Sequence, residues 1–183
     1  MNNNDILRRL RYTFSYSDSK MISVFALANL KVSRDMNSSW LKREDDPGYK
    51  ECNDKQMASF LNGLIIENRG KKDGKIPEAE ERLTNNIIFT KLKIALNLKA
   101  EDVLAIMDLA EFRISKHELS AFFRKPGNRH YRVCQDQILR NFLKGMQIKY
   151  REQGEEIGSK DDNEHKDDIK VKPVKFKYNY KKK

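Results

Sequence analysis

The sequence predicts an all-α protein with two tandem homologous four-helix domains, helix-turn-helix-like corners and a disordered, lysine-rich C-terminal tail. Three observations predict it. The chain of 183 residues aligns with itself at an offset of 82 residues, without a gap, from Asn3 to Ile66. Apolar residues recur at the 3.6-residue period of helices, and no alternating run or Asn-Gly hairpin turn indicates strands. The composition then changes to a charged segment that lacks a core-forming period.

The internal repeat consists of paired positions that keep their residues. Asn3-Asn4 aligns with Asn85-Asn86, and CNDKQMASFLNGLI, which starts at Cys52, matches CQDQILRNFLKGMQI, which starts at Cys134. A period this long exceeds the roughly 20–50 residues of solenoid units and indicates a duplicated domain. The predicted segments are a first domain at 3–69, a linker at 70–84, a second domain at 85–151 and a tail at 152–183.

Each copy is expected to hold four helices. Apolar spacing places the first at roughly 4–16 and 86–98 and the second at 19–29 and 101–111. Ser33 and Ser115 are N-caps of the third helix, and Ser115 forms a capping box with Glu118. The fourth helix begins near Asn53 or Gln135. It contains Gly63 or Gly145, which cost about 1 kcal/mol against alanine, so we expect a neighbouring helix to approach closely there.

The linker and the tail differ from the domains in composition. The linker, GKKDGKIPEAEERLT, is expected to be an exposed joint with a helical start at Pro77-Glu78. The tail begins acidic and carries seven lysines and no acid from Lys170 to Lys183, which predicts a disordered segment of both charges. With no signal peptide, no apolar run of about 18 residues and two cysteines, the chain is expected to be cytoplasmic and not membrane-bound.

The net charge of +10 is unevenly distributed, which favours an anionic partner. The formal charge is +2 for residues 3–69, zero for 70–84 and +7 for 85–151. The second copy therefore becomes the candidate nucleic-acid-binding region, for DNA or RNA, together with the tip of the tail. A solvated helix face beside a polar loop is the alternative. The candidate binding residues are Lys116, His117, Ser120, Arg124, Lys125, Arg129 and Arg132, with Arg34 and Lys42 in the first copy.

The second and third helices of each copy resemble a helix-turn-helix pair, because a short turn leads to a serine-capped helix. In that interpretation the third helix is the recognition helix. The usual turn glycine is absent, however, and Lys31 and Arg113 stand at its position. A left-handed backbone is harder to reach without glycine, so a simple helical corner remains the alternative.

The sequence predicts no enzyme. No phosphate-binding glycine loop, GxSxG or HExxH motif is present. His117 and His130 have no histidine partner in the first copy, and one cysteine per copy cannot complete a zinc site. Cys52 and Cys134 are interpreted as structural residues packed under a loop. We therefore expect no catalytic residue, metal or cofactor.

Four segments of the chain resemble the bacterial YehS-like family: NNDILRRLRY, WLKREDDPGYKEC, FLNGLIIENRGK and NNIIFTKLKIALNLKAEDVLAI. The resemblance covers roughly residues 3–150 and excludes the tail. It implies an all-helical, cytoplasmic bacterial protein with two copies of a domain of unknown function, and it implies no catalytic residue or substrate. Two hypotheses follow: a nucleic-acid-binding protein, or a helical protein-interaction adaptor without a nucleic-acid role.

Overall fold

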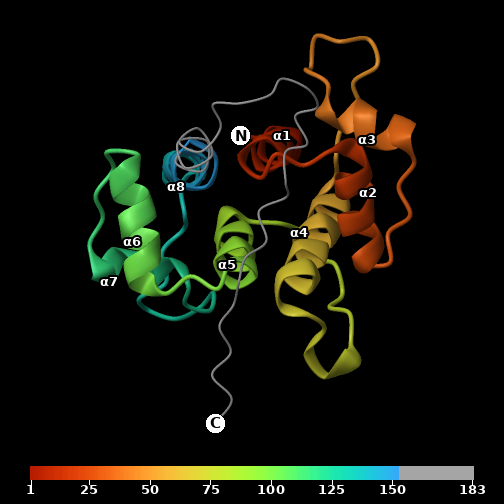
Figure 1. The fold of residues 1–183 in the computed structure, drawn as a ribbon. Coiled ribbons are helices and arrows are strands. Elements are labelled where there is room, and N and C mark those ends of the chain that lie inside the picture. The colour runs from red at the N-terminus through yellow and green to blue at the C-terminus, as the bar shows by residue number, and fades with distance from the viewer. Residues whose placement is uncertain (153–183) are drawn as a thin grey trace, which may run out of the picture.

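The all-α prediction is confirmed by the computed structural model, which describes residues 1–152 and contains no strand within them. The predicted tail lies outside the described residues, apart from its first residue. Two sets of four α-helices follow one another along the chain (Figure 1). The first set is α1 (Asn3–Thr13), α2 (Asp18–Leu27), α3 (Arg34–Leu41) and α4 (Asp54–Arg69). The second set is α5 (Asn85–Ala95), α6 (Ala100–Leu109), α7 (Lys116–Phe122) and α8 (Asp136–Gln147), with a short π-helical turn at Ile148–Glu152.

The predicted helix starts are correct to within one residue, and side-chain caps fix the starts of the third helices. The Ser33 and Ser115 hydroxyls accept from the N–H groups of Met36 and Glu118, and the Glu118 carboxylate completes the predicted capping box. The predicted ends of the first helices were about three residues too late. Ser15 and Asn97 adopt φ values of 51° and 52°, and this left-handed backbone ends each helix.

The corner between the second and third helices contains a left-handed residue that the sequence did not indicate. It is Asn29 in the first copy, with φ of 60°, and Glu111 in the second, with φ of 57°. The left-handed residue therefore lies two positions before Lys31 and Arg113, which occupy the position where a helix-turn-helix would have its glycine. Asparagine tolerates this backbone, whereas glutamate does so at a cost.

The linker has no helical start at Pro77-Glu78, contrary to the prediction. Its one helical segment is a 3₁₀ turn at Lys72–Gly74. The buried Asn62 side chain of α4 donates to the carbonyl oxygens of Pro77 and Glu78, at 3.2 Å each. These bonds hold the segment against α4, so the linker is docked on the first copy.

The two glycines of the fourth helices lie under a crossing helix, as predicted. A Cβ atom on Gly63 would lie 1.9 Å from the Val24 carbonyl oxygen of α2. A Cβ atom on Gly145 would lie 1.9 Å from the Ile106 carbonyl oxygen of α6. Only glycine allows the backbones to approach this closely.

The doubled Asn-Asn and Cys-x-Asp motifs bind one another within each copy. Asn4 donates to the carbonyl oxygens of Trp40 and Lys50 and accepts from the Cys52 N–H at 2.9 Å. Asn86 makes the same three bonds to Phe122, Arg132 and Cys134. A buried asparagine thus satisfies three backbone groups of the irregular segment that precedes the fourth helix. This explains why both motifs recur together.

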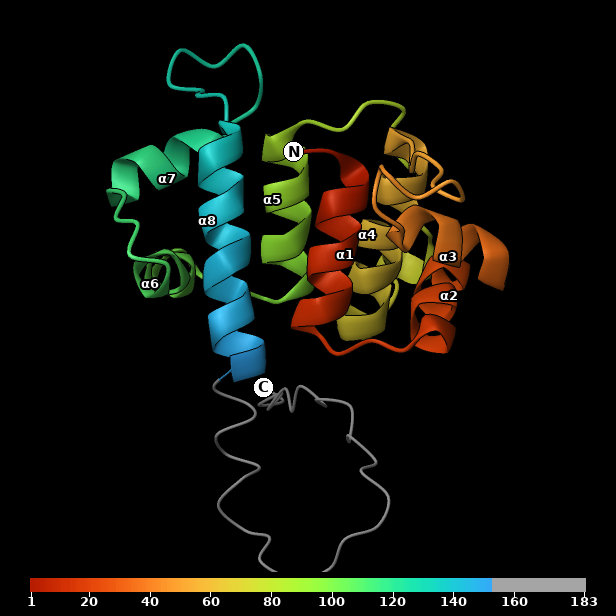
Figure 2. The same cartoon turned by 90° about the horizontal axis from the view of Figure 1, so that it is seen from above.

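The two copies pack on each other through equivalent helices. Figure 2 shows α8, α5, α1 and α4 grouped in the middle, with α2 and α3 at one end and α6 and α7 at the other. Helix α4 packs on α5, and α8 packs on α1. Arg69 donates to the Ile94 carbonyl oxygen at 3.2 Å, and Arg151 donates to that of Tyr12 at 2.7 Å. Because these residue pairs are repeat equivalents, the chain resembles a two-fold symmetric dimer, with one continuous core.

Candidate nucleic-acid interface

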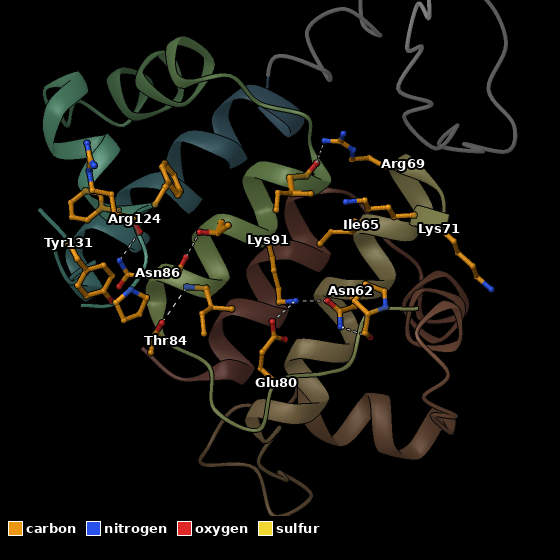
Figure 3. Close-up of a pocket in the computed structure, with 18 of the residues that line it drawn as sticks. Asn62, Ile65, Arg69, Lys71, Glu80, Thr84, Asn86, Lys91, Arg124 and Tyr131 are labelled. Atoms are coloured by element: carbon orange, nitrogen blue, oxygen red, sulfur yellow. Dashed lines mark hydrogen bonds and ion pairs between the residues drawn. The ribbon is translucent and has the colours of Figure 1, made fainter. Parts of the chain in front are cut away.

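A groove of about 990 Å³ lies between the two copies, beside the linker. The C-terminal half of α4, the linker, the outer face of α5 and the segment after α7 form its walls. In Figure 3, Arg69 and Lys71 lie on the linker side, and Arg124 and Tyr131 lie on the opposite side. The groove therefore has walls from both copies and from the linker.

A buried lysine lies at the linker side of the groove floor. Lys91 of α5 has only 10% of its side chain exposed, and its Nζ atom lies 2.9 Å from the Glu80 carboxylate. The same amino group donates to the Asn62 side chain (Figure 3). The pairing neutralises the lysine, as a buried charge requires, so this part of the floor carries no net charge.

The rest of the floor is apolar and aromatic. Ile65 comes from α4 and Ile87 and Ile94 from α5, and Ile94 is 39% exposed. Phe123 and Tyr131 line the opposite wall. Phe123 packs edge-on against the buried Phe89 ring, with 5.0 Å between centroids, which fixes its position.

The rim of the groove carries cations without an acidic partner. Lys71, Lys72 and Arg124 are exposed, and within residues 1–152 none of them forms an ion pair or a side-chain hydrogen bond. Arg69 differs, because it also donates to the Asn97 side chain at 3.1 Å. The groove thus combines a neutral, largely apolar floor with a cationic rim.

The equivalent loop of the first copy shows the opposite charge arrangement. Lys42 lies 2.9 Å from Asp46 and Arg43 lies 3.8 Å from Asp45. Hydrogen bonds from Lys42 and then from the Gly48 N–H lower the pKa of Asp46, so it is ionised at neutral pH. In the second copy Arg124 and Lys125 keep the two cations, but Pro126, Gly127 and Asn128 replace Glu44, Asp45 and Asp46. The cations of the second copy are therefore unneutralised.

The first copy has a charged bridge at the place equivalent to the groove. Arg8 of α1 forms an ion pair with Asp5 and donates to the Lys42 carbonyl oxygen, which bridges α1 to the end of α3. The equivalent positions on α5 are Thr90 and Ile87, which cannot make this bridge. The second copy therefore has uncharged side chains, which line the groove, where the first copy has this bridge.

The predicted binding residues do not form one surface. Arg124 lines the groove, and Lys125, Arg129 and Arg132 are exposed in the segment between α7 and α8 that follows it. Lys116, His117 and Ser120 are exposed on α7, where Lys116 is paired with Glu101 at 2.8 Å. Arg34 and Lys42 belong to the first copy, and Figure 2 shows α3 and α7 at opposite ends of the molecule.

The prediction missed the residues that make the groove, namely Lys71, Lys72, Ile87, Thr90 and Lys91. A signal for two of them was present. Alignment of the copies places Ile87 and Thr90 opposite Asp5 and Arg8, so an i, i+3 ion pair of the first copy is replaced by uncharged residues. Such a paired loss of charge makes these two positions of the second copy stand out in the alignment.

The cysteines and acids offer little chemistry within the described residues. Burial, and then the nearby Asp54 and Asp136 respectively, raise the pKa of Cys52 and Cys134 to about 12 each, so both thiols are protonated at neutral pH. Across residues 1–152, no cluster of three or more histidines, cysteines or carboxylates could hold a metal ion. In the same residues no helix has the length and apolarity needed to cross a membrane.

The fold defines a class: an all-α protein made of two tandem repeats that pack as a pseudo-dimer. The chain belongs to the family described as "Protein of unknown function (DUF1456)", whose model matches twice, at residues 3–70 and 85–152. It is 43% identical over 148 residues to "Uncharacterized protein YehS" of Escherichia coli (strain K12). This alignment covers 80% of this chain and 94% of that protein. The predicted YehS-like relationship is therefore confirmed. No solved structure matches the chain.

Proposed function

We propose that the protein binds nucleic acid through the groove and the adjoining segment between α7 and α8. The observation that supports this is the unneutralised pair Arg124 and Lys125, whose counterparts Lys42 and Arg43 are paired with acids. Cations held without a protein counter-ion are available to phosphate oxygens, and arginine can bind phosphate through two parallel bonds. Asn128, Arg129 and Arg132 extend the same exposed loop.

A matched pair of double variants tests the proposal. We expect Arg124→Ala/Lys125→Ala to weaken binding to a 20-mer oligonucleotide by about ten-fold and to reduce the log–log salt slope by about 1 to 2, because up to two phosphate contacts are lost. Lys42→Ala/Arg43→Ala removes the same formal charge from the equivalent loop and should leave both quantities nearly unchanged. Fluorescence anisotropy at several salt concentrations measures both.

The proposal fails if the full-length protein does not bind RNA or DNA at low salt. It also fails if the two double variants weaken binding equally, because total charge would then explain the result. Circular dichroism of each variant excludes unfolding as the cause.

A protein-interaction adaptor is the second candidate, favoured by the apolar floor of Ile65, Ile87 and Ile94. Apolar side chains gathered in a hollow that solvent reaches are typical of partner sites. A pull-down from nuclease-treated lysate distinguishes the two functions. A partner that persists after nuclease treatment and is lost on Ile94→Asp supports the adaptor.

A further inference from the structure

Resting on the proposed function, we infer that the groove binds an unpaired stretch of RNA or DNA, with bases against the floor and phosphates at the rim. The first argument is the chemistry of the floor. A duplex presents phosphates outward and keeps the faces of its bases stacked inside, so it offers nothing apolar to fill a hollow. An unpaired strand exposes those faces, which pack on apolar and aromatic side chains regardless of base identity.

The second argument is the separation of charge from apolar surface within the groove. The lysine nearest the floor, Lys91, is already neutralised by Glu80 at 2.9 Å, so this side of the floor does not attract phosphate. The unneutralised cations, Lys71 and Lys72 on one side and Arg124 on the other, lie at the edges. A single strand has this pattern, with uncharged bases on one side and phosphates on the other.

The third argument comes from the first copy, which has the same fold but a charged bridge at the equivalent place. There Arg8 is paired with Asp5 and donates to the Lys42 carbonyl oxygen, so it joins α1 to the end of α3. The second copy has Thr90 and Ile87 instead, and about 990 Å³ is open. That volume is at the upper end of the range for small-molecule sites, which is enough for a short stretch of bases.

The decisive variant transfers the charged bridge of the first copy to the second. Ile87→Asp/Thr90→Arg adds one acid and one base, so the net charge is unchanged while the groove is covered. We expect it to weaken binding of a 12-mer oligo-uridine and a 12-mer oligo-thymidine at least ten-fold. Binding of a 12-base-pair duplex should change less than two-fold, and the full-length wild-type protein should prefer the single strands.

The control is Arg113→Ala, which alters an exposed arginine that is ion-paired with Asp108 between α6 and α7, outside the groove, and it should change neither affinity. If the double variant does not fold, Thr90→Arg alone provides the test. Its added positive charge would strengthen non-specific binding, so weaker binding of single strands would then indicate a covered groove.

The outcomes separate the inference from the proposed function. Equal binding of single strands and duplex, or unchanged single-strand affinity in a folded groove variant, overturns the inference while nucleic-acid binding stands. Failure of the wild-type protein to bind any oligonucleotide overturns both. A difference between oligo-uridine and oligo-thymidine identifies RNA or DNA as the preferred source of the unpaired strand.

Discussion

The two copies of the repeat share their buried contacts and differ at their surfaces. Asn4 and Asn86 satisfy the same three backbone groups, and Gly63 and Gly145 allow the same 1.9 Å approach. At the surface, the first copy pairs its cations with acids, whereas the equivalent part of the second copy is hollowed and cationic. A buried polar group without its partner costs about 1–3 kcal/mol, while a surface pair is worth at most about 1 kcal/mol. Duplication therefore constrains the interior and leaves the surface able to acquire a new role.

The largest expected effect tests whether the interiors are equivalent. Gly63→Ala and Gly145→Ala should each destabilise the protein by about 3 kcal/mol, because the new methyl group meets a backbone carbonyl that cannot move aside. Urea denaturation measures the loss. Ala105→Gly, on an exposed position of α6, should cost only about 1 kcal/mol through helix propensity. A clear difference between the two glycine variants would show that the crossings are not equivalent.

A smaller effect should distinguish the two junctions between the copies, namely the one where α4 packs on α5 and the one where α8 packs on α1. Lys91→Met leaves the half-buried Glu80 carboxylate and the buried Asn62 without their cation, and we expect a loss of about 2 kcal/mol. The repeat equivalent, Arg9→Met, replaces an exposed side chain and should change stability by less than about 0.5 kcal/mol. Urea denaturation measures both losses of stability. If Lys91→Met and Arg9→Met destabilise the protein equally, the linker does not make the α4–α5 junction different from the other.

The smallest effect per copy is a loss of stability at high pH. Each buried cysteine should contribute to it equally. Burial raises the pKa of Cys52 and Cys134 from 9.0 to about 12. An unfolded thiol therefore loses its proton above about pH 9 while the folded thiol keeps it. Stability is unaffected below pH 9 and falls as the pH rises from 9 towards 12. Unfolding measured at pH 8 and pH 10 should show this fall, and Cys52→Ala/Cys134→Ala should reduce it. Rapid thiol modification of the native protein at pH 8 would contradict the prediction.

Local signals made most of the fold predictable from the sequence. The Ser115–Glu118 capping box and the apolar stripe of the fourth helix act within a few residues, so both could be recognised without a structure. Helix ends were less predictable. Ser15 and Glu111 adopt a left-handed backbone that neither residue type favours, because the packing of the next helix imposes it.

The candidate site was only partly predictable for a related reason. Arg124 stood out because the second copy carries the excess charge, and it does line the groove. Lys91 reads as one more surface cation in the sequence, and its burial depends on α4 and the linker packing over α5. Contacts between distant elements have no local signature, so the groove became visible only with the structure.

The linker docks beside one of the two equivalent junctions, where Asn62 binds the carbonyl groups of Pro77 and Glu78. At the other junction the repeat equivalents of Asn62 and Lys91 are Lys144 and Arg9, and a lysine side chain accepts no hydrogen bond from an arginine. The other junction therefore lacks the residues that build this groove. A ligand held in it should saturate at one molecule per polypeptide, however closely the halves resemble each other.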